Sequence, residues 1–91
     1  MKNIVLVFRN SNSRDYWFNY IVDCLNKNIM GIKKHSYNYE IEILDKIKIC
    51  CITEANVDKF LIGRHDYKVF TDLETRLEKH PKKMLGEILN G

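Results

Sequence analysis

The chain has 91 residues, of which 45% are hydrophobic and 30% are charged, and its formal net charge is +3. These values are typical of one small globular domain over residues 1–91, and they exclude a disordered, collagen-like or low-complexity chain. No apolar run approaches the ~18 residues of a membrane-spanning helix, and the apolar stretch Ile4–Phe8 lacks the cleavage site of a signal peptide. We therefore expect a cytoplasmic protein without a membrane partner.

The residue usage carries three further indications. Lys, Ile and Asn are abundant and have AT-rich codons, which is typical of low-GC bacteria, their phages and mobile elements; for a phage-encoded protein the expected compartment is the bacterial host cytoplasm. Residues 1–39 carry six basic and two acidic side chains, and such a basic half attracts nucleic acid or phosphate. Cys24, Cys50 and Cys51 lack the spacing of a metal site, so we expect reduced thiols and no metal.

The first elements in chain order are a strand and a helix. Ile4–Phe8 is a continuous run of apolar, mostly β-branched or aromatic residues, which predicts a strand buried on both faces. The polar loop Arg9–Arg14 follows, with Ser13 as the expected N-cap of a helix over residues 15–30 that ends at Gly31. We assign Trp17 and its neighbour Phe18 to the core side of this helix rather than to an exposed aromatic patch.

The period of the apolar residues then changes to two, which predicts a β-hairpin over Tyr37–Thr53. A three-residue loop over 44–46 places Ile43 opposite Ile47 and Glu42 opposite Lys48, so that each face keeps one kind of residue.

Two helices and a strand are expected in the last part of the chain. Thr53 is expected to cap a short helix that ends at Gly63, and Tyr67–Thr71 is expected to be a strand. Thr71 and Glu74 have the spacing of a capping box for a final helix, in which Pro81 predicts a break near the preceding residue.

The element order β-α-β-β-α-β-α predicts a small three-layer α/β sandwich. We expect Ile4–Phe8 and Tyr67–Thr71 to be parallel neighbours in the centre of the sheet, with the hairpin Tyr37–Thr53 extending one side. The helices that begin near Asp15 and Asp72 should pack on the faces of this sheet.

Ligands of such sheets bind beyond the carboxyl ends of the strands, which places Arg9–Arg14 and Asp72 at one edge. Asp72 is a candidate for holding Mg²⁺ through water, and the competing reading makes it part of the helix start with Glu74. The loop lacks the phosphate-loop pattern G-x-x-x-x-G-K-[ST]. The residues predicted to bind phosphate or nucleic acid are Arg9, Ser11, Asn12, Ser13, Arg14, Lys33, Lys34 and Arg64.

Residues 39–72 resemble part of the ATPase domain of phage large terminases, a P-loop NTPase family. The resemblance lies in Glu40–Ile43, Lys48–Cys51, Phe60–Arg64 with its Leu-x-Gly-Arg pattern, and Tyr67–Asp72. It implies a P-loop-like fold in which Arg9–Arg14 stands where the family has its phosphate loop. The chain departs from the family because it lacks the phosphate-loop consensus and has Leu between its two acids after the last strand. The resemblance therefore implies a truncated, degenerate domain without expected hydrolysis.

Our leading hypothesis is a non-enzymatic accessory protein of a phage or mobile element that binds a protein or nucleic-acid partner and needs no cofactor. One alternative is a P-loop-like enzyme that binds nucleotide or phosphate through Arg9, Arg14 and Asp72, with a Mg-nucleotide as its cofactor. Another is a self-associating structural domain, a homodimer in which the hairpin edge pairs with a second copy.

Overall fold

The structure, a computed structural model, describes residues 2–44 and 46–90. These residues form four helices and five strands, with two short 3₁₀ turns, η1 (Asn26–Asn28) and η2 (Glu54–Asn56). In chain order the strands and helices are β1 (Lys2–Phe8), α1 (Ser11–Leu25), β2 (Ile29–Lys34), β3 (Tyr39–Ile43), β4 (Ile47–Thr53), α2 (Val57–Leu61), β5 (Tyr67–Phe70), α3 (Leu73–Lys79) and α4 (Pro81–Asn90).

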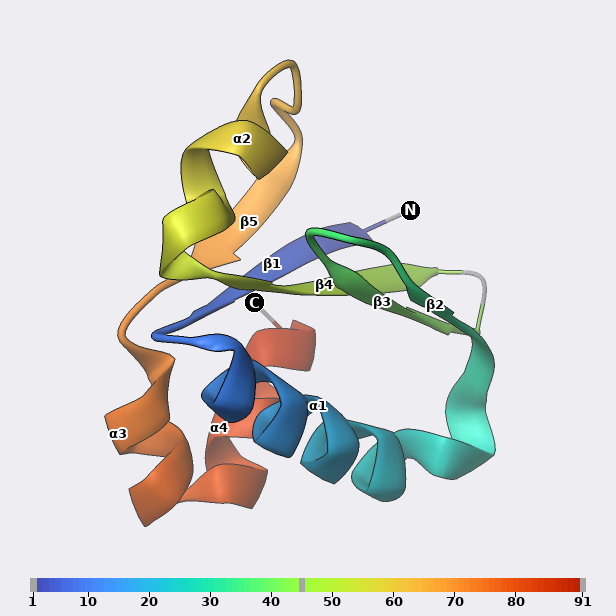
Figure 1. Cartoon of the computed structure of the whole chain (residues 1–91). Helices are drawn as coiled ribbons and strands as arrows, with labels where there is room; N and C mark the ends of the chain where they lie inside the picture. The colour runs from blue at the N-terminus through green and yellow to red at the C-terminus, as the bar shows by residue number, and fades with distance from the viewer. Residues whose placement is uncertain (1, 45, 91) are drawn as a thin grey trace.

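The strands form one mixed sheet in the order β2-β3-β4-β1-β5 (Figure 1). Strand β1 is parallel to both of its neighbours, β4 and β5, whereas β2, β3 and β4 are antiparallel. The predicted α/β class and the parallel pairing of Ile4–Phe8 with the strand from Tyr67 are thus confirmed. The expected central position of that last strand is wrong. Because β4 pairs with the other side of β1, the short β5 is left at the edge of the sheet.

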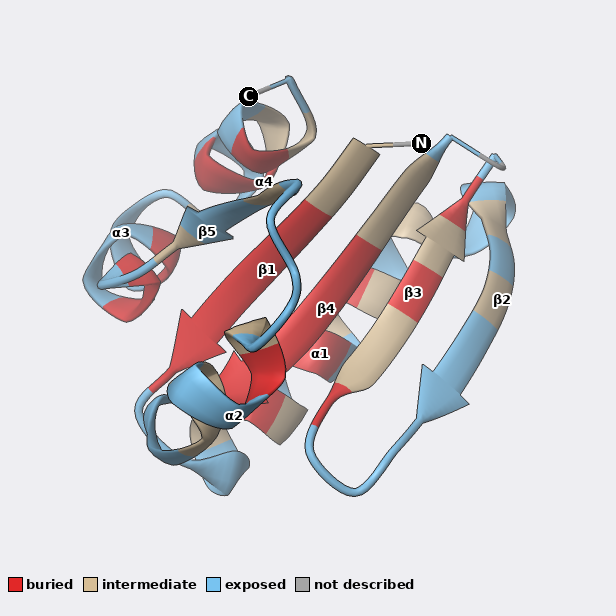
Figure 2. Cartoon of the chain, turned by 90° about the horizontal axis from the view of Figure 1, so that it is seen from above, coloured by how far each residue is buried: buried red, intermediate tan, exposed pale blue. Residues whose placement is uncertain are grey.

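Helices cover both faces of the sheet, so the predicted three layers are present but unequal. Helices α1, α3 and α4 cover one face, and α2 alone covers part of the other (Figure 1). Figure 2 shows β1 and β4 buried over much of their length, as expected for the strands between the two layers. The neighbouring Cys51 and Cys50 belong to the larger and the smaller apolar cluster respectively, so they point to opposite faces.

The first helix lies earlier in the chain than predicted. It spans Ser11–Leu25, and its N-cap is Asn10, whose side-chain oxygen accepts a hydrogen bond from the Ser13 N–H at 2.9 Å. Ser13 is therefore inside the first turn rather than at the cap. Trp17 and Phe18 are 8% and 2% exposed, which confirms their assignment to the core.

Strand β2 was not predicted, because its residues resemble the end of a helix followed by a basic link. It pairs with β3, but the register shifts between Ile29 and Gly31, and this irregularity hides the alternation of a strand. The apolar side chains of Ile29, Met30 and Ile32 therefore look like a continuation of the helical stripe. Since β2 covers β3, the hairpin edge on which the self-association hypothesis rested is already paired, and the free edges are β2 and β5.

The hairpin is confirmed with the predicted register, Ile43 opposite Ile47 and Glu42 opposite Lys48. Its expected three-residue loop includes Asp45, which lies outside the described residues, and Leu44 at the start of this turn has a left-handed backbone with φ 50°.

The C-terminal helices follow the prediction at their break but not at their start. Helix α3 ends at Lys79 and α4 begins at Pro81, as the proline predicted. The capping box is wrong, because the residue before α3 is Asp72 with a left-handed φ of 55°, and Glu74 accepts its hydrogen bond from a distant segment. Over the described ranges 2–44 and 46–90, no helix combines the length and the hydropathy that crossing a membrane requires.

We predict that Ile49→Ala lowers the free energy of unfolding by about 2–5 kcal/mol, because it opens a cavity in the larger apolar cluster. The matched control is Ile62→Ala, whose side chain is 76% exposed. It should change the same quantity by less than about 0.5 kcal/mol. Urea denaturation followed by Trp17 fluorescence measures both, and equal effects would show that the assigned core is wrong.

The three cysteines should differ in reactivity towards iodoacetamide at pH 8. Burial raises the pKa of the Cys50 thiol to about 11 and also raises that of Cys51, so both are almost wholly protonated, whereas Cys24 is exposed. Mass spectrometry of the folded protein should find one alkylated site, Cys24, and all three in urea. Rapid labelling of Cys50 in the folded state would contradict its burial beneath α2.

Candidate functional site

Two adjacent parallel strands send the chain to opposite faces of the sheet. The segment after β1 enters α1 on one face, and the segment after β4 leads to α2 on the other (Figure 1). Phe8 and Thr53, the last residues of these strands, are paired in register, so the two departing segments start side by side. In open α/β sheets such a point, where the connections diverge, is where ligands bind.

A hollow of about 460 Å³ lies at this point, which we call the switch-point hollow. Its size is in the range of small-ligand sites. It is lined by Arg9 and Asn10 of the β1–α1 loop, by Ser11 and Arg14 of α1, by Thr53, Ala55 and Asn56 from the end of β4 and η2, and by Ser36 of the β2–β3 turn.

The first turn of α1 contributes backbone donors beside this hollow. The side chain of Asn10 accepts the N–H of Ser13, and its carbonyl accepts the N–H of Arg14. The N–H groups of Ser11 and Asn12 precede the first residue that has an intrahelical partner, so they are uncommitted. The helix dipole adds a partial positive charge at this end, which favours an anion.

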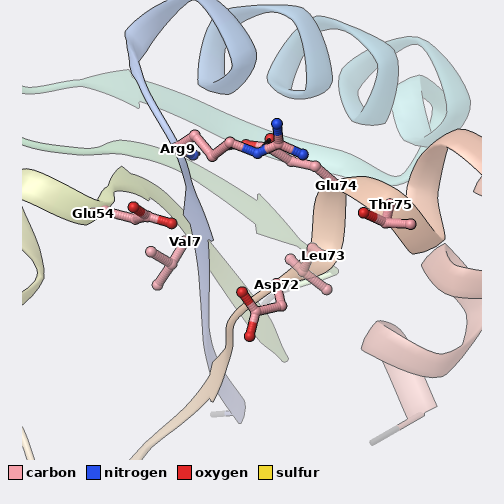
Figure 3. A pocket seen from close by; sticks show the side chains of 7 residues that line it. All are labelled: Val7, Arg9, Glu54, Asp72, Leu73, Glu74 and Thr75. Atoms are coloured by element: carbon pink, nitrogen blue, oxygen red, sulfur yellow. Dashed lines mark hydrogen bonds and ion pairs between the residues drawn. The ribbon is translucent and has the colours of Figure 1, made fainter.

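Arg9 is held in place by Glu74, the second residue of α3. The Arg9 backbone N–H donates to Glu74 Oε1 at 2.7 Å, and the guanidinium Nε lies 2.6 Å from Glu74 Oε2 (Figure 3). The Glu74 side chain is 7% exposed, whereas that of Arg9 is 62% exposed. Among residues 2–44 and 46–90 no other acceptor contacts this guanidinium, so its terminal amino groups are open to solvent and to an anion.

Arg14, the other arginine of the loop, is committed to the protein. Its guanidinium carbon lies 4.1 Å from the centre of the Tyr39 ring, and its Nε and Nη2 donate to Asp15 Oδ1 at 3.2 and 3.1 Å. Its side chain is only 10% exposed. Arg14 thus forms part of the wall of the hollow, and Arg9 is the exposed cation.

Asp72 lies near Arg9, as the sequence predicted, at a second hollow of about 70 Å³. The ion pair Arg9–Glu74 also lines this smaller hollow, and the carboxylates of Asp72 and Glu54 lie to one side of that pair (Figure 3). Within the described part of the chain, no three His, Cys, Asp or Glu side chains are grouped so that they could hold a metal ion. Water-mediated Mg²⁺ binding by Asp72 stays a prediction.

The remaining predicted residues are dispersed over the molecule. Asn12 and Ser13 line a groove of about 540 Å³ between α1 and the start of the α3–α4 bend, together with Tyr16, Trp17 and Tyr20.

The three remaining basic candidates lie elsewhere. Lys33 lines a hollow on the opposite face of the sheet, beside Glu40 and Glu42. The amino group of Lys34 lies over the rings of Phe18 and Tyr39. Arg64 packs its guanidinium over the Phe60 ring and donates to the Phe60 carbonyl at 2.5 Å. Of the eight residues predicted to bind phosphate, only Arg9, Ser11 and Arg14 therefore share the switch-point hollow.

The sequence reasoning missed the half of the hollow that follows β4. Thr53 makes no side-chain cap to the following helical turn, contrary to the expectation, and its Oγ1 accepts a hydrogen bond from Asn56 Nδ2 at 3.2 Å. The signal available in the sequence was the unbroken apolar run Ile49–Ile52, which is typical of a strand with neighbours on both sides. Its parallel pairing with Ile4–Phe8 would have brought Thr53 and Asn56 to the same edge.

No protein family, curated protein or solved structure matches this chain.

We predict that Glu74→Ala lowers the free energy of unfolding by about 1–3 kcal/mol, because it leaves the Arg9 N–H without its acceptor and the guanidinium without its partner. Glu74→Gln keeps an acceptor for that N–H and should lose less. The control is Glu78→Ala on the exposed side of the same helix, which should stay within about 0.5 kcal/mol of the original chain. Indistinguishable denaturation curves for Glu74→Ala and Glu78→Ala would refute this role of Glu74.

Proposed function

We propose that the chain is a non-enzymatic accessory protein of a phage or mobile element that binds single-stranded nucleic acid by its phosphates. The observation that carries the proposal is the meeting of the exposed Arg9 guanidinium with the uncommitted first-turn amides of α1 at the switch-point hollow. Amides at a helix start and an arginine fork are complementary to a phosphate group. The abundance of Lys, Ile and Asn, residues whose codons are AT-rich, supports the phage or mobile-element source.

A polymer suits this surface better than a single nucleotide. Ser11 lines the switch-point hollow, and the next residue, Asn12, lines the groove beside it, so one turn of α1 borders both depressions. Tyr16 in that groove is 65% exposed and makes an edge-to-face contact with Trp17. A strand with one phosphate in the hollow can continue across α1 and stack a base on Tyr16.

The second candidate is a P-loop-like enzyme that binds a Mg-nucleotide. It is favoured by one observation, the two carboxylates of Glu54 and Asp72 at the small hollow that shares Arg9 with the larger one. The loop Arg9–Arg14 is evidence against this enzyme, because it contains no lysine to stabilise the negative charge of the phosphates. The Glu74 carboxylate, moreover, is already occupied by Arg9.

We expect Arg9→Ala to weaken binding of a fluorescein-labelled 12-nucleotide oligothymidine by about tenfold, because it removes one charged hydrogen-bonding group. Fluorescence anisotropy at several salt concentrations measures this. The control, Lys27→Ala, removes the same charge at the far end of α1, about 22 Å away along the helix, and should change the affinity less than about twofold.

A second variant is needed because Arg9 also neutralises the buried Glu74. Ser36→Asp adds a negative charge to the hollow from an exposed turn, and Asn19→Asp adds the same charge in the exposed middle of α1. Only Ser36→Asp should weaken binding. Affinity that does not depend on salt, or equal effects of the two aspartates, would refute the proposed site. A saturable change of Trp17 fluorescence with ATP and Mg²⁺, lost in Asp72→Ala, would favour the enzyme instead.

A further inference from the structure

The bend between α3 and α4 carries a dense group of basic side chains far along the chain from the switch-point hollow. All five of these side chains are exposed. No ion pair involves any of them within residues 2–44 and 46–90. The five residues are Arg76, Lys79, His80, Lys82 and Lys83.

The helix dipoles favour the basic residues at the end of α3 but not those at the start of α4. Arg76 and Lys79 lie in the last turn of α3, where a positive charge is stabilised by the helix carbonyls. Lys82 and Lys83 lie in the first turn of α4, which contains no acidic residue. A positive charge at that end opposes the dipole. The two lysines of α4 are therefore not explained by the dipole of their own helix.

A small hollow lies within this bend, which we call the elbow pocket. Its volume is about 160 Å³, and it is lined by Arg76, Lys79, His80, Lys83, Met84 and Glu87. Met84 is 3% exposed and forms an apolar floor, and the hydrocarbon stems of the long basic side chains extend from it. The pocket thus combines an apolar base with a cationic rim. Lys82, although adjacent in sequence, does not line it.

The dimensions and the lining indicate the class of ligand. A hollow of this volume accepts one side chain, whereas a nucleotide needs a site of about 300 Å³ or more. Glu87 is the one acidic residue of the lining, so Arg76, Lys79 and Lys83 leave the rim with a net positive charge. An apolar centre with a rim of net positive charge is complementary to an apolar residue flanked by carboxylates.

We propose that the elbow pocket docks an acidic segment of a partner protein, with one aliphatic side chain over Met84 and flanking carboxylates on Lys79 and Lys83. This surface is separate from the switch-point hollow, so the inference does not rest on the proposed nucleic-acid binding. A protein with both surfaces joins a nucleic acid to an acidic protein partner.

The chain offers a closely matched pair of variants for the test. Lys83→Glu and Lys82→Glu change the same charge in the same turn of α4, and both place an acid where the helix dipole favours it. Only Lys83 lines the pocket. The probe is a fluorescein-labelled peptide Glu-Asp-Glu-Leu-Glu-Asp-Glu, titrated with the full chain and followed by anisotropy.

We expect the peptide to bind saturably. Lys83→Glu should weaken this binding at least about fivefold and Lys82→Glu less than about twofold, because, of these two lysines, only Lys83 lines the pocket. Replacing the peptide's Leu by Ser should also weaken binding at least about fivefold, since the apolar anchor is lost. Three results would overturn the proposal. They are no binding at millimolar peptide, equal losses in the two lysine variants, and a Ser peptide that binds as tightly as the Leu peptide. Oligothymidine binding that depends on Lys83 and not on Arg9 would assign the elbow to nucleic acid instead.

Discussion

The position of β1 between two parallel neighbours is the constraint on which the rest of the structure depends. A parallel neighbour cannot be reached by a tight turn, so each connection must cross a face of the sheet. The connection after β1 uses the face covered by α1, and the connection from β4 to β5 uses the opposite face through α2. The switch-point hollow lies where the two chain segments leave Phe8 and Thr53, and it follows from that divergence.

A single buried carboxylate then connects this edge to the rest of the helical layer. In most helices a glutamate in the first turn serves the amides of its own helix. In this chain Glu74 instead accepts the N–H of Arg9, which lies 65 residues earlier, and binds the guanidinium with its second oxygen. The contact fixes α3 against the end of β1 and turns the cation outwards. One residue thereby couples the packing of a C-terminal helix to the chemistry of an N-terminal loop.

The features that depend on interactions between residues close in the sequence were predicted correctly. The buried strand Ile4–Phe8, the hairpin register and the break at Pro81 follow from periodicity and backbone chemistry within a few residues. The strand Ile29–Lys34 escaped prediction because a bulge interrupts its alternation, and it is a strand only because β3 pairs with it. Likewise the spacing of Thr71 and Glu74 suggested a cap, but a partner far away in sequence decided where the carboxylate binds. Only part of the site was predicted, for the same reason. Arg9 directly follows a strand that the sequence predicted, whereas Ser36 and Asn56 come to the site through the pairing of β2 with β3 and of β4 with β1.

Charged side chains that have no counter-charge beside them mark the surfaces that are free to bind a charged partner. On the part of the α2 face that α2 leaves uncovered, the Glu40 carboxylate lies 3.6 Å from His35 Nε2 and 4.0 Å from Lys48 Nζ, so the opposite charges of Glu40 and Lys48 largely neutralise one another. Arg14 is likewise neutralised by Asp15 and covered by the Tyr39 ring. Arg9 keeps the outer side of its guanidinium exposed, and the bend before α4 has no counter-charge in its first turn. The proposed nucleic-acid site and the proposed peptide site therefore use different cations, Arg9 after β1 and Lys79 with Lys83 at the bend.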